Sequence, residues 1–236
     1  MPAPLKLKNV TKVYTQAGQS VQALSAITIT LRPEECAVII GPNGSGKSTL
    51  LKLVAGIEQP TSGTITTPGR PAYLPQRPSL LPWRTVEQNL LLPHDVQKIV
   101  PRPSTDDIRK LLKDFGLLEF RSFYPSALSG GMQQKVALLR SVLTSPSLLL
   151  LDEPFASLDS ITRLELQKWL LELKRKTRSS LVCVTHDIPE AILLADTLYV
   201  LSERPGHIRQ KFTIPQKRSQ QHSLEAKLRA LLVSKS

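Results

Sequence analysis

A glycine-rich stretch, GPNGSGKST at residues 41–49, has the residue types and the spacing that bind phosphate, because it contains the pattern G-x-x-x-x-G-K-[ST]. Glycines let successive backbone N–H groups curl around phosphate oxygens, and the helix that follows adds positive potential. Lys47 is then expected to reach the β- and γ-phosphates, and the Ser48 hydroxyl to take a position on Mg²⁺. The predicted ATP contacts in this loop are Gly41, Pro42, Asn43, Gly44, Ser45, Gly46, Lys47, Ser48 and Thr49.

Two acidic residues end a second apolar run, SLLLLDEP at residues 147–154. A carboxylate at the end of a strand beside a phosphate loop can hold Mg²⁺, usually through water, and we expect this role for Asp152. Glu153, one residue further, is placed to accept a proton from an attacking water as a general base. A surface Asp-Glu pair is the alternative, but the four leucines directly before it favour a buried strand.

Three further side chains could complete such a site. His186 follows the apolar run VCVT and is a candidate γ-phosphate contact that distinguishes ATP from ADP. Gln76, in YLPQ, could reach Mg²⁺ or the attacking water, and Tyr14 could stack on adenine. Taken alone, each has a structural alternative: a satisfied histidine at a strand end, a solvated loop glutamine, and a tyrosine of the core or surface.

A second candidate anion site begins the stretch ALSGGMQQKVALLRSVL at residues 127–143. It has a serine, two glycines and then an unbroken helical pattern, and backbone N–H groups at a helix start bind anions. No lysine lies within this loop. The chain thus carries two phosphate-binding loops, and the second needs an explanation.

The elements that must position these residues alternate between β-type and helical runs, which indicates an α/β core. Strands are expected at residues 5–10, 26–31, 36–40, 147–152, 179–186 and 197–202, and a turn–strand pair at 61–67 and 71–76. Helices are expected at residues 47–56, 160–176, 188–196 and 222–232. Residues 81–144 are mostly helical in pattern, with one helix beginning near Ser104, where STDDI offers a cap. We therefore expect a single domain, 1–236, whose α/β core is interrupted by a helical subdomain at about 81–144.

The composition limits the partners. The net charge is +12, and after Ser202 eight Lys and Arg residues face only two Glu. Such an excess suggests nucleic acid, an anionic membrane surface or an acidic protein. No DNA-reading pattern or aromatic interleaving accompanies it, so we expect a solvated or membrane-facing surface and no nucleic-acid partner.

The apolar segments are expected to be core. No apolar run approaches the roughly 20 residues that span a bilayer, and the first residues do not form a secretory signal, so a cytoplasmic protein is expected. Cys36 and Cys183 lie in apolar, β-branched runs and are expected to be inert core residues rather than a disulfide or a metal site. A helical stripe near the C-terminus is expected to be a packing face; it consists of Leu224, Leu228, Leu231 and Leu232.

These motifs, in this order, resemble the nucleotide-binding subunit of an ATP-binding cassette (ABC) transporter over almost the whole chain. In the resemblance Tyr14 is the aromatic adenine platform, Gln76 belongs to the Q-loop, and LSGGM at 128–132 is the signature motif. ASLD supplies Asp159 as the D-loop residue, and His186 is the switch histidine. The resemblance implies a P-loop NTPase core with a mixed sheet, an antiparallel β subdomain and a helical insertion.

The resemblance also explains the second loop. In this family two ATPase subunits close head to tail, and each signature loop caps the ATP held by the other subunit. Ser129, Gly130 and Gly131 would therefore bind the partner's nucleotide, and they need no lysine of their own. The implied catalytic residues are Glu153, His186, Lys47 and Gln76, and the implied Mg²⁺ positions are Ser48, Gln76 and Asp152.

The implied function is ATP hydrolysis coupled to import of a small solute. The implied partners are a second copy of the chain, two transmembrane permease subunits and, indirectly, an extracytoplasmic solute-binding protein, with the chain at the cytoplasmic face of the plasma membrane. LLPWRTVEQNLLLP at 80–93 and SERPGHI at 202–208 resemble the nitrate, sulfonate and taurine importers, a group that also serves thiamine-precursor pyrimidines. The helical insertion, with Trp83 and the residues after Gln76, should form the groove for a coupling helix of the permease.

The chain departs from the family directly after the signature. The family often has Arg-Gln-Arg there, whereas this chain has Gln133, Gln134 and Lys135. Gln134 matches, but Lys135 lacks the planar fork of arginine, so an ion pair near the membrane partner is expected to be weaker.

Two other functions stay open at this point. One is a soluble ABC-type ATPase acting on DNA or the ribosome, which only the basic charge supports. The other is a protein that holds ATP without turnover, against which the intact Glu153 and His186 argue.

Overall fold

The buried strand β3 (Cys36–Ile40) precedes the phosphate loop in the computed structural model, which describes residues 5–16, 18–97, 102–144, 146–215 and 218–233. Its side chains alternate between two hydrophobic cores. Cys36, Val38 and Ile40 belong to one, and Ala37 and Ile39 to the other. Both faces of the strand are therefore covered, as its unbroken apolar run predicts.

The central sheet has six strands. Their spatial order is β5 (Ala72–Leu74), β6 (Leu148–Asp152), β7 (Ser180–Val184), β3, β8 (Thr197–Leu201) and β9 (Ile208–Thr213). All neighbours are parallel except β8 and β9, so the sheet is mixed, as expected. β9 was not among the expected strands, because its sequence IRQKFT forms a half-exposed edge without an apolar run.

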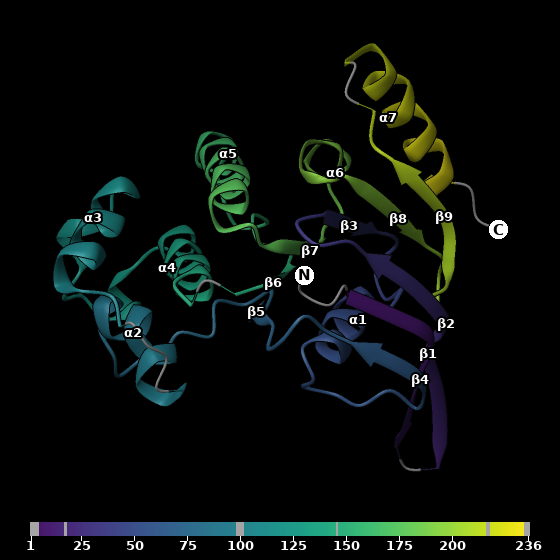
Figure 1. Cartoon of the computed structure of the whole chain (residues 1–236), viewed down its shortest axis with the longest axis horizontal. Helices are drawn as coiled ribbons and strands as arrows, with labels where there is room; N and C mark the ends of the chain where they lie inside the picture. The colour runs from purple at the N-terminus through teal and green to yellow at the C-terminus, as the bar shows by residue number, and fades with distance from the viewer. Residues whose placement is uncertain (1–4, 17, 98–101, 145, 216–217, 234–236) are drawn as a thin grey trace.

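A second, antiparallel sheet covers one face of the central sheet (Figure 1). Its order is β2 (Gln19–Leu31), β1 (Leu5–Gln16) and β4 (Ser62–Thr66), and the helix α1 (Lys47–Val54) packs into the core that the two sheets share. β1 and β2 pair from Leu5 opposite Leu31 to Gln16 opposite Gln19, which is longer than expected. The first four residues of β2 are exposed, so they show none of the alternation that predicts a strand.

Three helices form a separate lobe, drawn in teal at the left of Figure 1: α2 (Val86–Gln97), α3 (Thr105–Asp114) and α4 (Gly130–Val142). The lobe has its own core of buried residues, namely Val86, Leu90, Ile108, Leu112, Leu117, Leu128, Val136 and Leu139. The expected cap is confirmed, because Ser104 and Asp107 form a reciprocal capping box at the start of α3.

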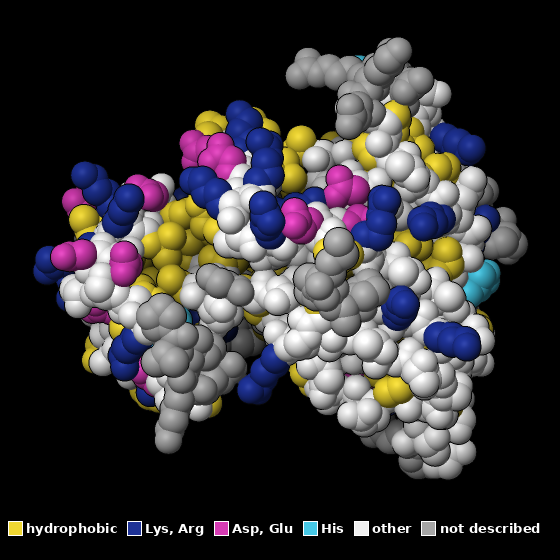
Figure 2. Space-filling view, viewed as in Figure 1, with side chains coloured by type: hydrophobic (Ala, Val, Ile, Leu, Met, Phe, Trp, Pro, Cys, Tyr) yellow, Lys and Arg dark blue, Asp and Glu magenta, His cyan; other side chains and the backbone are white. Residues whose placement is uncertain are grey.

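The helices α5 (Ser160–Thr177), α6 (Ile188–Leu194) and α7 (Arg218–Val233) pack into the core on the other face of the central sheet. The leucine stripe of α7 is a packing face, as expected: Leu228 is fully buried and Leu224, Leu231 and Leu232 pack around it. Figure 2 shows hydrophobic side chains gathered in the hollow between the helical lobe and α5. Within the described residues, no helix is both long and apolar enough to cross a membrane.

Both cysteines are free and buried, as expected, and burial raises the pKa of each thiol, that of Cys36 to about 12. They are therefore protonated core residues at neutral pH.

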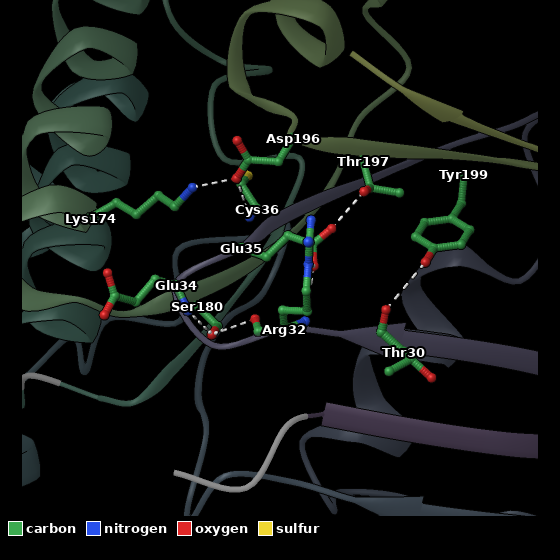
Figure 3. A network of polar contacts seen from close by, with 10 residues as sticks. All are labelled: Thr30, Arg32, Glu34, Glu35, Cys36, Lys174, Ser180, Asp196, Thr197 and Tyr199. Carbon is green, nitrogen blue, oxygen red and sulfur yellow. Dashed lines mark hydrogen bonds and ion pairs between the residues drawn. The ribbon is translucent and has the colours of Figure 1, made fainter. Parts of the chain in front are cut away.

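A polar network closes the end of the central sheet at which β3 begins (Figure 3). Lys174 of α5 pairs with Asp196 at 2.6 Å between Nζ and Oδ2, and the Asp196 carboxylate accepts a hydrogen bond from the Cys36 N–H at 2.8 Å. The Thr197 hydroxyl donates to Oε1 of Glu35 at 2.5 Å. The network holds α5, β3 and β8 together, so β3 enters the phosphate loop from a fixed position.

Thr197→Val should lower the free energy of unfolding by about 1–3 kcal/mol, because it leaves the buried Glu35 carboxylate without this donor. Burial raises the pKa of Glu35, but hydrogen bonds from Thr197 and Arg32 outweigh it, so the net pKa is lowered. A lowered pKa stabilises the fold above the unfolded-state value, and this stability is lost as the pH falls through the folded-state pKa. Urea unfolding at several pH values should show the cost of Thr197→Val near neutral pH and a shrinking cost in acid.

Thr213→Val is the matched control, since Thr213 faces Thr197 across the β8–β9 pair and is exposed. Equal effects of the two substitutions would show that the bond to Glu35 contributes nothing to stability.

Candidate active site

The phosphate loop turns from β3 into α1 through backbone that only glycine adopts easily. Gly46 has φ +92°, and a Cβ there would lie 2.6 Å from Leu24 Cδ2. Lys47 begins α1, and its Nζ donates to the carbonyls of Gly41 and Pro42 at 2.8 and 2.7 Å. Burial lowers the pKa of Lys47, while Glu153 and Asp152 oppose that shift. The Lys47 ammonium is thus held at the first residues of the loop, within the electrostatic influence of Glu153 and Asp152.

The loop opens into a cavity of about 340 Å³. It is lined by Tyr14, Val21, Ala23, Asn43, Gly44, Gly46, Lys47, Ser48, Thr49, Gln76, Glu153 and Arg204. Most of these are ATP contacts expected from the sequence, whereas Arg204 is not. None of the signature residues Ser129, Gly130 and Gly131 lines it.

Hydroxyl and carboxylate oxygens meet next to Ser48, which lines the cavity, at the point where β6 ends. The Ser48 hydroxyl donates to Oδ1 of Asp152 at 3.1 Å, and the Tyr73 hydroxyl donates to Oδ2 at 3.3 Å. Burial raises the pKa of Asp152, and the two hydrogen bonds counter part of that shift. The sequence analysis did not predict Tyr73 as a site residue. The only sequence feature that could have indicated it is its position in the strand directly before Gln76.

Glu153 brings the other expected catalytic residues together. Its Oε2 accepts a hydrogen bond from Gln76 Nε2 at 3.3 Å and lies 3.3 Å from His186 Nδ1. Its backbone has φ +48°, which is unusual for a residue with a side chain. The Glu153 N–H donates to the Val184 carbonyl at 2.9 Å and ties this strained residue to β7. Backbone strain of this kind is concentrated at functional sites.

Tyr14 lies at the far side of the cavity and is 39% exposed. Its hydroxyl donates to Glu58 Oε2 at 2.5 Å, and the Lys12 ammonium lies 4.9 Å from its ring centroid. Burial and then the bond to Glu58 raise the pKa of its phenol. The ring is therefore held in place at the rim, as a platform for a flat ligand requires.

The signature residues begin α4, away from this cavity. The Ser129 side chain caps the helix by accepting a hydrogen bond from the Met132 N–H at 3.3 Å, and Gly130 is exposed. Asp159 caps α5 in the same way, accepting from the N–H groups of Ile161 and Thr162 at 3.1 and 3.0 Å. Those bonds, that of Thr162 first, lower the pKa of Asp159. Gly131 and Leu158 lie side by side, so the signature and D-loop segments are neighbours.

The two glutamines after the signature have clear contacts. Gln133 Nε2 donates to the Pro125 carbonyl at 3.0 Å and so anchors the turn that leads into the signature. Gln134 is buried, and its Nε2 donates to the Pro154 carbonyl at 3.0 Å. Gln134 therefore connects α4 to the segment directly after Glu153.

A further acid, Glu190 on α6, has no equivalent among the residues predicted from the sequence. It is 5% exposed, and burial raises its pKa to about 7. Nearby, Arg163 donates to the Leu158 carbonyl at 3.1 Å and lies 3.8 Å from Asp187. A single acid in an amphipathic helix carries no sequence signal of burial, so only the structure finds it.

Comparison with known proteins places this geometry in a family. The family model described as "ABC transporter" matches residues 24–156. A formylaminopyrimidine import ATP-binding protein of Halalkalibacterium halodurans is 39% identical, over 98% of this chain and 97% of its own length. A nitrate import ATP-binding protein of Synechocystis sp. is 38% identical, over 89% of this chain and 82% of its own length.

Solved structures agree with the fold. A dimeric ATP-binding cassette in a post-hydrolysis state, bound to ADP and Pi, has a TM-score of 0.80 and 28% identity, and the match covers 90% of this chain and all of that one. The ATP-binding subunit of an ABC transporter has a TM-score of 0.82 and 27% identity, over 98% of this chain and all of that one.

Proposed function

This chain belongs to the ABC transporter family, as an ATP-hydrolysing import subunit, and we propose that two copies of it close head to tail around two ATP molecules. One observation carries this proposal: the signature residues begin α4, where a helix offers N–H groups to an anion, but none of them lines the cavity that Lys47 of the same chain lines. In a head-to-tail pair, Ser129, Gly130 and Gly131 of one copy cap the nucleotide on the phosphate loop of the other. The related cassette solved with ADP and Pi is itself a dimer.

The residues around Asp152 suit Mg²⁺. The donor set consists of a buried carboxylate, a hydroxyl and an amide oxygen from Asp152, Ser48 and Gln76, and hard oxygen donors are what this ion prefers. Mg²⁺ bound there with ATP would neutralise charge on the phosphates. Asp152 is suited to hold the ion through water, while Lys47 moves from the loop carbonyls to the phosphates.

Glu153 is placed to take a proton from the attacking water. Gln76 and His186 both contact its Oε2, so they orient the carboxylate and can reach the γ-phosphate from the same side. Asp159 fixes the D-loop at the start of α5, and Tyr14 supplies the adenine platform. The proposed site therefore gives a role to each of the predicted catalytic, D-loop and adenine-platform residues.

The chain is proposed to act as one domain, 1–236, whose helical subdomain at about 81–144 contacts the permease at the cytoplasmic face of the membrane. A groove of about 540 Å³ lies between this subdomain and the core. It is lined by Ala55, Ile57, Arg70, Pro71, Ala72, Tyr73, Pro93, Ala137, Arg140, Ser141, Thr144, Pro146 and Ser147. Trp83, expected in the groove, does not line it and is 70% exposed.

Arg140 makes the groove positively charged, so the groove favours a negatively charged partner. Its Nη1 donates to the Ser79 carbonyl at 3.0 Å, and no acid of the described chain pairs with it. Burial lowers the pKa of its guanidinium, and Arg70 adds a second positive charge without any acid in the lining. A permease helix that presents a carboxylate fits this groove, because it would compensate the desolvated arginine.

Arg140→Glu should abolish co-purification with the co-expressed permease subunits and leave ATP binding by the isolated chain unchanged. Arg175→Glu makes the same charge change at an exposed position of α5 and is the control. If Arg140→Glu and the control co-purify with the permease equally well, the groove is not the docking site.

The solute is proposed to be a small organic or inorganic anion or a pyrimidine, delivered by an extracytoplasmic binding protein. The relatives that support this class import nitrate, aliphatic sulfonates or formylaminopyrimidine. Transport assays with these solutes in a reconstituted system would separate them.

A further inference from the structure

Arg204 lies in the loop between β8 and β9, and it reaches the nucleotide cavity from outside the known motifs. Its Nε donates to the Gly44 carbonyl at 3.3 Å. Its Nη2 lies 3.3 Å from the position that a Cβ on Gly44 would take. The guanidinium is therefore held against the middle of the phosphate loop.

The loop that carries Arg204 is closely tied to the phosphate loop and to β2. The Gly206 N–H donates to the Ala23 carbonyl at 2.9 Å, and the Gly206 carbonyl accepts from the Ser25 N–H at 2.8 Å. A Cβ on Gly206 would overlap the Ser45 carbonyl oxygen, so glycine is needed for this close approach.

Ser202 stabilises the same loop through side-chain hydrogen bonds. Its hydroxyl accepts a hydrogen bond from the His207 N–H at 3.0 Å and donates one to the Pro205 carbonyl at 3.1 Å. A loop with this many internal bonds holds its arginine in place before any ligand binds, which lowers the entropy cost of a contact.

The Arg204 guanidinium forms no ion pair within the part of the chain that the structure describes. No carboxylate of the described residues pairs with it, and its two Nη groups make no hydrogen bond among those residues. The cavity that it lines also contains Lys47 and a single acid, Glu153. A planar, permanently charged fork is well matched to phosphate oxygens.

We propose that Arg204 is an additional nucleotide-binding residue, whose guanidinium contacts the polyphosphate chain of the ATP held by its own subunit. This proposal rests on the proposed nucleotide site. It adds to that site a cation from the β8–β9 loop, next to Gly44 of the phosphate loop. The SERPGHI segment thereby acquires a function: its serine and glycine position the arginine that lies between them.

The test is calorimetric titration of the full chain, in a Glu153→Gln background that prevents turnover, with MgATP and separately with inorganic tripolyphosphate. Arg204→Gln should weaken the binding of both ligands about tenfold, the loss of one charge-assisted contact. Arg204→Lys should lose less, because it keeps the charge. Arg175→Gln removes the same charge from exposed α5 and should bind both ligands like the parent.

Each other result overturns the proposal in a distinguishable way. Unchanged binding of both ligands by Arg204→Gln would show that the guanidinium makes no contact. Weakened ATP binding with unchanged tripolyphosphate binding would place the contact on the nucleoside instead. If the parent chain binds neither ligand, the proposed nucleotide site fails as well.

Discussion

Glu153→Gln should reduce ATP hydrolysis by about 10²–10⁴-fold, because glutamine cannot accept the proton of the attacking water. The amide has the same size and can keep the contact with Gln76, so the site retains its shape. ATP should therefore still bind and bring two chains together, and the mutant should accumulate as an ATP-bound dimer. Phosphate release and light scattering, measured on the same sample, record both effects.

Glu172→Gln is the control, since Glu172 is exposed on α5 and pairs with no described residue. If Glu153→Gln hydrolyses ATP within tenfold of the wild type, the general base lies elsewhere. If neither chain hydrolyses ATP while the mutant still dimerises with ATP, turnover needs the permease subunits, and the comparison must be repeated on the assembled transporter.

Gly130→Asp should reduce ATP hydrolysis at least as strongly as Glu153→Gln does, although Gly130 lies outside the cavity of its own chain. A Cβ at Gly130 meets nothing within 4 Å, so the fold accepts the side chain. An acid in the first turn of α4 also suits the helix dipole. The new carboxylate would, however, point at the γ-phosphate on the partner chain and repel it. ATP-dependent dimerisation and hydrolysis should both be lost.

Gly130→Ala adds the same Cβ without charge and should keep most of the activity. Binding of ATP to the isolated Gly130→Asp chain should be normal, because its own phosphate loop is intact. Loss of that binding would mean that the signature loop acts within its own chain.

Most of the site could be predicted from the sequence because its residues follow local patterns. The phosphate loop and the two carboxylates each directly follow an apolar strand, and parallel strands bring their ends to one edge of the sheet. The contacts that Glu153 makes with Gln76 and His186 follow from this arrangement.

The parts that the sequence could not predict depend on long-range contacts. Arg204 reaches Gly44 only because the β8–β9 loop docks on β2, which no local pattern records. β9 lacks an apolar run, and Trp83, which the family resemblance placed in the docking groove, is exposed and does not line the groove between the helical subdomain and the core. The buried Glu190 was missed for the same reason, since its burial comes from packing between elements.

The central claim is that each ATP is held by two chains, and mixing two defective variants tests it directly. In a Glu153→Gln background, one variant carries Lys47→Ala and the other Gly130→Asp. Only a mixed dimer has a site with both an intact phosphate loop and an intact facing signature. We predict that neither variant dimerises with ATP when it is tested by itself, and that the mixture forms dimers with one ATP per two chains. A mixture that forms no ATP-dependent dimers would contradict the shared site.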